Sequence, residues 1–240
     1  MSCANATAPL NLSGNTDNIC NLKCAYSFKY APTSLRITNR GNYLSFLTDD
    51  ANSPPVTYND QNYNVKEARL YTPSLHNWSG EQVDAELVIS HTNTNSTNNL
   101  LVCIPIVKSS TTTAECAVFF DFIMAEAQRT ATSQGQQTVY NNPTLTLGKF
   151  IPMKPYYSYI GTLPWTPCNG VYSYVVFKKQ DAITMSPSAY SALNTLIPSP
   201  HNIQPKNENN TGSISYNANG PTPPNVGEIY IDCQPTGDVC

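Results

Sequence analysis

The residues of this chain whose types could support catalysis or metal binding are its three histidines, its eight cysteines and a few acidic residues. His76, His91 and Glu86 lie close together in the sequence, and imidazole and carboxylate groups are common ligands of zinc. They could form a metal site. The interpretation we prefer is that both histidines are structural and hydrogen-bonded. His201 lies in a loop-rich segment, and no Ser-His-Asp or Cys-His pattern marks an activated nucleophile.

The cysteines show no spacing typical of a metal site. No Cys-x-x-Cys pair occurs, and the closest pair, Cys20 and Cys24, has no second Cys or His pair nearby to complete a zinc site. Cys103 and Cys116 lie in apolar segments, where we expect each to be a small buried hydrophobic residue. The cysteine pattern leaves the redox compartment undecided.

Composition excludes some classes of function. Only 12% of the 240 residues are charged, and 13 lysines and arginines oppose 16 aspartates and glutamates, for a net charge of −3. We therefore expect no binding of nucleic acid or of an anionic membrane surface. The first residues lack the basic and apolar regions of a signal peptide, and the longest apolar run, Leu100–Val107, is too short for a membrane helix. We expect a soluble chain with a packed core.

Most of the chain is typical of short strands separated by turns rich in Asn, Pro, Gly and Asp. In Val83–His91, apolar residues alternate with polar ones, which predicts a strand with one buried and one polar face. Strands are predicted at Cys24–Tyr30, Tyr43–Thr48, Tyr63–Tyr71, Val83–His91, Leu100–Val107, Val171–Lys178 and Glu228–Asp232. Helices are predicted at Thr113–Arg129 and at Ser188–Leu196, the second with Ser186 as its N-cap and Pro187 in its first turn.

The C-terminal part differs in composition from the rest. The segment from Pro198 to Gly227 is crowded with Pro, Asn, Ser and Gly, which favours a long surface connection or a tail that becomes ordered against a partner. The strand predicted after it must pair with the same sheet or with a neighbouring molecule. We therefore expect a domain at residues 1–197 and an extended tail, ending in a strand, at 198–240.

Four stretches carry a resemblance to a known family. They are Thr7–Leu12, Tyr63–His76, Ala85–His91 and Tyr157–Cys168. In this order and at plausible spacing, they resemble the opening, zinc-binding and Leu-Thr-Thr-Pro-Pro-Cys motifs of the α-type carbonic anhydrases. The resemblance covers residues 7 to about 197 and implies a mainly β fold. We expect a large, twisted, predominantly antiparallel sheet with a few short peripheral helices.

The resemblance does not extend to the zinc ligands. The family binds zinc through three histidines on two strands, and the matching positions here are Arg69, Tyr71 and Val88. A guanidinium cannot lose its proton, a phenol does so only near pH 10, and valine has no lone pair. We therefore expect no zinc site, no other cofactor and no enzymatic activity.

Other positions of the family's active site are also changed. Its zinc-adjacent threonine matches Pro164, the glutamate that partners this threonine matches Leu75, and the tryptophan of the carbon dioxide pocket matches Tyr174. The proton-shuttle histidine falls near Asn42. Glu86 is retained, at a position that orients a zinc-binding histidine in the family. Because that histidine is absent, we expect Glu86 to pair with Arg69 or Tyr71.

The family resemblance also implies a disulfide. In extracellular members, a cysteine before the opening motif pairs with the cysteine that ends Thr-Pro-Pro-Cys, and these positions match Cys3 and Cys168. The alternative is a pair of reduced thiols that lie near each other.

Several stretches further resemble carbonic-anhydrase-like proteins of large nucleocytoplasmic DNA viruses. They are Leu22–Tyr30, Pro73–His76, Leu101–Ile106 and Ile231–Pro235. This implies a minor capsid protein in the virion, with the major capsid protein and neighbouring minor capsid proteins as partners. Membrane contact is expected only through a partner or a C-terminal extension. The alternative is a virion surface protein that binds a host glycan, as a degenerate carbonic anhydrase domain of poxviruses does. Sulfate recognition there needs clustered cations, of which this chain has few.

Overall fold

The computed structural model describes residue 3 and residues 5–13, 18–49, 54–111, 115–207 and 214–222. Its helices are α1 (Glu115–Thr130), α2 (Pro187–Leu196) and the short 3₁₀ helices η1 (Leu147–Phe150) and η2 (Lys179–Asp181). The longer strands are β3 (Leu35–Asn39), β4 (Leu44–Thr48), β6 (Gln61–Tyr71), β8 (Ala85–Asn93), β9 (Asn98–Lys108), β11 (Tyr156–Gly161) and β12 (Val171–Phe177). The shorter strands are β1 (Leu10–Leu12), β2 (Tyr26–Phe28), β5 (Val56–Tyr58), β7 (Asn77–Trp78), β10 (Gln137–Tyr140), β13 (Ile183–Met185), β14 (Lys206–Asn207) and β15 (Ser215–Asn217).

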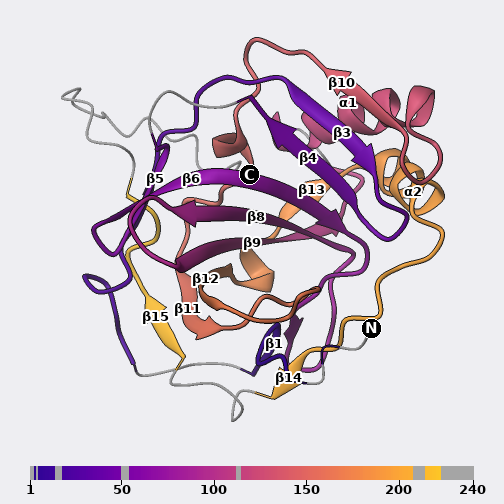
Figure 1. The fold of residues 1–240 in the computed structure, drawn as a ribbon. Coiled ribbons are helices and arrows are strands. Elements are labelled where there is room, and N and C mark those ends of the chain that lie inside the picture. The colour runs from indigo at the N-terminus through magenta and orange to yellow at the C-terminus, as the bar shows by residue number, and fades with distance from the viewer. Residues whose placement is uncertain are drawn as a thin grey trace.

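A curved sheet of twelve strands, counted over the described residues, dominates the molecule (Figure 1). Its main path runs β10-β3-β4-β6-β8-β9-β12-β11-β15. The pairs along this path are antiparallel except β9 with β12, and β13 also joins β9 in parallel. The predicted mainly β, predominantly antiparallel sheet with few peripheral helices is confirmed.

The strand at the centre of the sheet is buried on both faces. The prediction of a strand near Val83–His91 is confirmed by β8, but the prediction of a polar face is wrong, because Glu86 and Ser90 are 0% and 5% exposed. Both are buried because side chains pack on each face of the sheet. Each has a polar partner, and the Ser90 hydroxyl donates to the Glu67 carbonyl at 2.8 Å. Buried polar groups are tolerated when they are hydrogen-bonded in this way.

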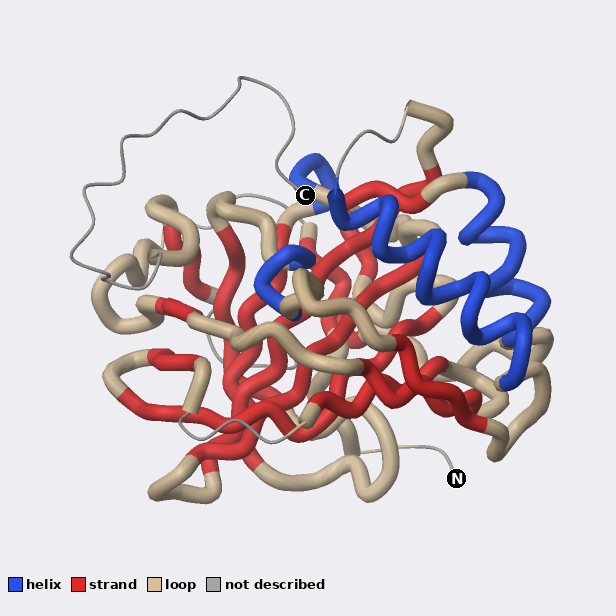
Figure 2. Tube along the Cα trace, turned by 90° about the horizontal axis from the view of Figure 1, so that it is seen from above, coloured by secondary structure: helices blue, strands red, loops and turns tan. Residues whose placement is uncertain are grey.

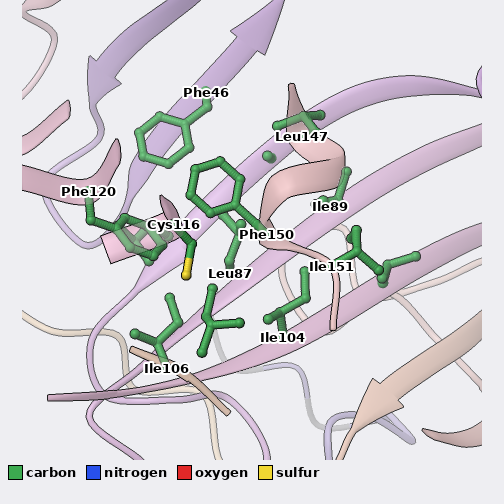
Figure 3. Packing of buried hydrophobic residues seen from close by; sticks show 14 of the residues in the cluster. Phe46, Leu87, Ile89, Ile104, Ile106, Cys116, Phe120, Leu147, Phe150 and Ile151 are labelled. Carbon is green, nitrogen blue, oxygen red and sulfur yellow. The ribbon is translucent and has the colours of Figure 1, made fainter. Parts of the chain in front are cut away.

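Two hydrophobic cores lie on the two faces of the sheet. On one face, Cys116 and Phe120 of α1 and Phe150 of η1 pack against Leu87 and Ile106 (Figure 3). Figure 2 shows the two longer helices gathered on one side of the strands. The other core includes side chains of β6, β8, β9, β11 and β12 that point to the opposite face, and the N-terminal strand β1 covers it. The candidate site lies in this second core.

The two predicted helices are confirmed. The helix expected at Thr113–Arg129 is α1, and Arg129 lies in its last turn, where a cation interacts favourably with the helix dipole. The helix expected at Ser188–Leu196 is α2, with Ser186 as its N-cap. The Ser186 hydroxyl accepts the backbone N–H of Ala189 at 3.0 Å. Within the described residues, neither helix is long and apolar enough to cross a membrane.

Disulfides fix the N-terminal region. The predicted bridge between Cys3 and Cys168 is confirmed, and a second one joins Cys20 to Cys24. Cys103 is buried without a disulfide, as expected. Cys116 is buried, but the expectation of a simple hydrophobic role is wrong, because it takes part in a disulfide.

The described part of the predicted tail packs against the domain. Strand β14 pairs with β1, and β15 pairs with the edge strand β11. Thr222 forms an isolated bridge to Ser27 of β2. The parts of residues 198–222 that form β14, β15 and the bridge at Thr222 therefore pack against the domain. The strand predicted at Glu228–Asp232 lies outside the described residues.

Candidate functional site

The structure brings the three positions that match the family's zinc ligands to one face of the sheet. Arg69 and Tyr71 are two residues apart on β6, so their side chains point to the same face. Val88 on β8 lies directly opposite Arg69 in the antiparallel register, and directly opposite residues share a face. These positions therefore converge at one place in the second core.

Aromatic rings and an ion pair fill this place. The guanidinium carbon of Arg69 lies 4.1 Å from the ring centre of Trp165 and 4.5 Å from that of Tyr43. The Tyr71 ring lies 5.2 Å from Tyr43 and 6.0 Å from Trp165, centre to centre. We call Tyr43, Arg69, Tyr71 and Trp165 the arginine–aromatic stack. Its cation belongs to Arg69, which is predicted from the sequence to match a zinc ligand of the family.

Polar contacts hold the stack in place. The Arg69 Nε atom donates to Oε2 of Glu67 at 2.7 Å, and Nη1 donates to the Tyr71 hydroxyl at 3.4 Å. Both side chains of the ion pair are largely buried, with 16% of Arg69 and 12% of Glu67 exposed. The Ser45 hydroxyl donates to the other carboxylate oxygen of Glu67. The charge of Arg69 is thus balanced within the stack.

The protonation states of Tyr71 and Arg69 do not favour metal binding. Burial raises the pKa of the Tyr71 hydroxyl above its usual value, and Arg69 opposes only part of that effect. Burial would lower the pKa of Arg69, but Tyr71 and Glu67 outweigh it, and the pKa lies above its usual value. Tyr71 therefore remains a phenol and Arg69 a cation, while Val88 offers no donor atom. These residues do not fit a zinc ion.

The other changed positions are occupied by packing residues. The Tyr174 hydroxyl donates to the Thr162 carbonyl at 2.6 Å, and its ring stacks on Tyr159 at 4.4 Å. Leu75 is buried in the second core. Pro164 has no hydroxyl group and is buried. No side chain at these three positions offers the acid, base or hydroxyl that the family uses there.

Glu86 does not pair with Arg69 or Tyr71, and that expectation is wrong. Its Oε1 atom lies 2.6 Å from Nδ1 of His76, and its Oε2 atom accepts the backbone N–H groups of Leu75 and His76 at 2.7 and 2.9 Å. Glu86 faces a turn that presents these donors together, whereas Arg69 already has Glu67. The retained glutamate therefore fastens the turn at residues 74–76 to β8.

The residues considered for a metal site do not assemble as a set of three. His76 and Glu86 lie together with Cys103, their ligand atoms within 4.8 Å of one another. The ring of His76 is fully engaged, because Nε2 lies 2.7 Å from the Tyr159 hydroxyl and Nδ1 faces Glu86. Burial, with Glu86 nearby, raises the pKa of the Cys103 thiol, so it stays protonated. These contacts are those of a hydrogen-bonded core.

His91 lies apart from this group, on the other face of β8. Its Nε2 atom is 2.8 Å from the Tyr30 hydroxyl, and the ring is buried. Burial lowers the pKa of His91 to about 3. His201 contacts the stack instead, with its ring perpendicular to that of Tyr71 at 5.4 Å and Nε2 bound to the Pro73 carbonyl at 2.8 Å.

Sequence reasoning missed the partners that fill the site, namely Tyr43, Glu67, Trp165 and His201. Trp165 had a usable signal. It occupies the second threonine position of the Leu-Thr-Thr-Pro-Pro-Cys motif, and a tryptophan there adds a large side chain where the family has a small one. The other three lie at positions whose contacts depend on how distant segments fold together.

A cleft of about 350 Å³ lies beside Trp165, near the N-terminal segment. Its polar lining is mostly uncharged, with Asn42, Asn202 and Gln204, and Lys206 is its cationic residue. Asn42, the residue nearest to the family's proton-shuttle position, thus lies at this cleft. Of the stack, Trp165 lines this cleft.

Comparison with known proteins identifies the family and the fold. The family model described as eukaryotic-type carbonic anhydrase matches residues 5–215. The carbonic anhydrase Cah3 of Chlamydomonas reinhardtii, solved with acetazolamide, has a similar structure, with a TM-score of 0.73, 16% identity and coverage of 89% of this chain and 91% of that chain. Dioscorin, solved with ascorbate, gives a TM-score of 0.68, 22% identity and coverage of 90% and 86%. No curated protein sequence matches the chain.

Proposed function

The chain belongs to the eukaryotic-type carbonic anhydrase family, and from this membership we propose a non-catalytic member that serves as a structural component, a minor capsid protein, of a large DNA virus particle. The position of Arg69 is the observation that supports the absence of catalytic activity. Its guanidinium lies over the rings of Trp165 and Tyr43 and is paired with Glu67. The match of Arg69 to a zinc ligand of the family is part of the proposal. No cofactor is assigned to the chain.

The chemistry of the site supports a protein without activity. Carbon dioxide hydration in this family depends on a metal-bound hydroxide, which needs three lone-pair donors and an open fourth position. Arg69, Tyr71 and Val88 supply no donor, and Trp165 covers the side from which a substrate would approach. A cavity needed for catalysis has become part of the packed interior.

The structural role is supported by the way the scaffold is reinforced. Both faces of the central strands are packed, disulfides secure the N-terminal region, and the described part of the C-terminal segment adds strands to the sheets. A rigid domain with a polar, weakly charged surface suits a subunit that must persist in a protein shell. The assignment to a virus particle depends on the resemblance of sequence stretches such as Leu22–Tyr30 and Leu101–Ile106 to the viral proteins.

Metal content and carbon dioxide hydration test the absence of activity. The purified chain is incubated with one equivalent of zinc, desalted, and assayed for bound metal and for hydration by stopped flow, beside an active carbonic anhydrase treated identically. We expect less than stoichiometric zinc and no rate above that of buffer. One zinc per chain together with hydration would contradict the proposal.

Cross-linking mass spectrometry on purified particles tests the structural role. We expect abundant links between this chain and the major capsid protein or neighbouring minor capsid proteins, within the virion. A chain that mild detergent removes while the shell stays intact would contradict a capsid position. That result would favour attachment at the particle surface.

The cleft beside Trp165 favours a second candidate, the binding of a host glycan. Amide groups and one indole ring are suited to the hydroxyl groups and apolar faces of neutral sugars. A single lysine in the lining gives little attraction for sulfated chains. Binding to a panel of neutral and sulfated glycans at physiological salt tests this function. An Asn202→Ala/Gln204→Ala variant should lose binding, while Gln137→Ala on the distant strand β10 should retain it.

A further inference from the structure

Asparagine followed by glycine occurs twice in this chain, at Asn169-Gly170 and at Asn219-Gly220. In such a pair the backbone nitrogen of the glycine can attack the side-chain amide of the asparagine, because glycine has no Cβ to shield that nitrogen or to restrict the backbone around it. The product is a cyclic imide, which water opens to aspartate or isoaspartate. The folded chain surrounds the two pairs differently.

The first pair is open to this reaction. Asn169 and Gly170 are both exposed and lie in the loop between β11 and β12, where Gly170 has a φ of 80°. Within the part of the chain that the structure describes, no group accepts the Gly170 N–H in a hydrogen bond, and the side-chain amide of Asn169 forms no hydrogen bond either. No contact therefore keeps the two reacting groups apart.

The second pair is held in place. Gly220 is buried, and its N–H donates to Oδ1 of Asn217 at 3.1 Å. The N–H of Asn219 donates to the same oxygen at 2.9 Å. The nitrogen that would have to attack is thus engaged, and losing its bond costs free energy. We propose that Asn169 is a site of spontaneous deamidation in the folded protein and that Asn219 is protected. This inference does not depend on the proposed function.

The reaction needs no reagent other than water. The Gly170 nitrogen bonds to Cγ of Asn169 and loses its proton, while the bond from Cγ to the amide nitrogen breaks and ammonia leaves. Water then adds to one of the two carbonyl groups of the imide and opens the ring. Opening on one side gives aspartate, and opening on the other side gives isoaspartate. Each product adds one carboxylate to the loop.

The loop that changes is the one that carries Trp165. The Leu163 N–H donates to the Asn169 carbonyl at 3.2 Å, and the Cys168 N–H donates to the Trp165 carbonyl at 2.7 Å, so these two bonds close the loop. Isoaspartate at position 169 diverts the main chain through the side-chain carbon, and the carbonyl that Leu163 uses then no longer lies in the main chain. Deamidation should therefore loosen the segment that holds the Trp165 ring against Arg69.

Ageing of the full chain tests the proposal. The folded protein is kept at physiological pH and temperature, beside a sample unfolded in guanidinium chloride. Both are then reduced and cut with trypsin at mildly acidic pH, where further deamidation is slow. Asn169 falls in peptide 150–178, in which it is the sole side-chain amide, and Asn219 falls in the peptide that begins at residue 207. Fragmentation in the mass spectrometer locates each replacement of an amide NH₂ by OH.

We expect Asn169 to be converted several-fold faster than Asn219 in the folded protein, and the two to be converted at similar rates in the unfolded chain. The matched control is Asn169→Gln, which keeps an exposed amide but would have to close a larger ring, so peptide 150–178 should stay unchanged. Intact Asn169 in the folded sample, or conversion of Asn219 at the same rate, would overturn the proposal.

Hydrogen exchange over residues 162–170 tests the effect on the loop. Exchange should be faster in the aged natural chain than in the aged Asn169→Gln variant, and equal before ageing. Equal exchange after ageing, in a sample where Asn169 has been converted, would overturn the loosening of this segment.

Discussion

The guanidinium of Arg69 lies over the ring of Trp165, 4.1 Å from its centre, and over the ring of Tyr43, 4.5 Å from its centre. Cation–π contacts of this kind stabilise by about 2 kcal/mol or more when they are removed from water. The same guanidinium is paired with Glu67. If Arg69 stands at a zinc-ligand position, as we propose, a cation of the protein itself takes the place of the metal.

Removing this cation should destabilise the protein. Arg69→Met keeps the length of the side chain but leaves the Glu67 carboxylate largely buried without its partner, which we expect to cost about 2–4 kcal/mol in the free energy of unfolding. Urea unfolding measures the loss. Arg69→Lys keeps the charge but not the planar group that stacks on the rings, so it should recover only part of the stability.

A double-mutant cycle separates the ion pair from the stacking. Glu67→Gln removes the charge that Arg69 neutralises, and Arg69→Met should cost less in that background than in the natural chain. An Arg69→Met variant as stable as the natural chain would contradict the importance of the stack.

Stability should fall in acid because of His91. Burial lowers its pKa to about 3, so the folded protein keeps this ring neutral at pH values where the unfolded chain, with a pKa near 6.5, binds a proton. The contribution is therefore constant above about pH 6.5 and is lost as the pH falls towards 3, by up to about 1.4 kcal/mol per pH unit. Unfolding free energies measured from pH 7 to pH 4 give this slope.

His91→Gln should flatten that dependence, because glutamine keeps a polar group near the Tyr30 hydroxyl but does not titrate. Tyr30→Phe is the matched control, since it removes the hydrogen-bond partner and leaves the imidazole in place. Equal slopes for the natural chain and His91→Gln would show that His91 does not carry the effect.

The two assigned disulfides should contribute unequally. Cys3 and Cys168 are separated by 165 residues, whereas Cys20 and Cys24 are separated by 4. In the chain-entropy model, the first cross-link stabilises by about 5 kcal/mol and the second by about 2 kcal/mol. Thermal unfolding of Cys3→Ala/Cys168→Ala and of Cys20→Ala/Cys24→Ala should show the larger loss in the first pair. The reverse order would mean that native-state contacts outweigh loop length.

Asn217 should control the attachment of β15. Its Nδ2 atom donates to the Tyr156 hydroxyl at 2.9 Å, and its Oδ1 atom accepts the N–H groups of Asn219 and Gly220 at 2.9 and 3.1 Å. Asn217→Ala removes these three hydrogen bonds and leaves the buried N–H group of Gly220 without this acceptor, at a cost of about 1–3 kcal/mol. Hydrogen exchange over residues 214–222 should become faster. Asn219→Ala, at an exposed side chain, should leave exchange unchanged, and equal rates in both variants would contradict the role of Asn217.

Long patterned segments were predictable from the sequence, whereas short ones were not. Strands β6, β8 and β9 and helix α1 have enough residues for their apolar spacing to be seen. Strands such as β1, β5 and β10 have only three or four residues, and their pairing is decided by the sheet edge that they meet. Even β11 was recognised only as a motif, because its tyrosines face both cores.

The side chains that surround Arg69 and Tyr71 were not predictable from the sequence. That Arg69, Tyr71 and Val88 match the family's zinc ligands comes from comparing motifs residue by residue and stays a prediction. The stack around them requires Tyr43, between β3 and β4, and Trp165, between β11 and β12, to meet at β6. That meeting depends on the curvature of the whole sheet. The same limit explains Glu86, whose carboxylate reaches the donors of a turn rather than its neighbours on β6.

The order of strands also determines how the chain can assemble as it is synthesised. Strands β3, β4, β6, β8 and β9 lie side by side in the sheet in the order in which they occur along the chain, so this part of the sheet can form while the rest is still being made. Strand β9 can pair with β12 only later, because the first residue of β12 lies more than seventy positions after the first residue of β9. Pairing between segments so far apart in the sequence is slow to form. In the same way, Cys3 can form its disulfide only after Cys168 has been synthesised, and β1 can pair with β14 only after β14 has been synthesised. Cys3 and β1 are thus synthesised well before the partners that hold them.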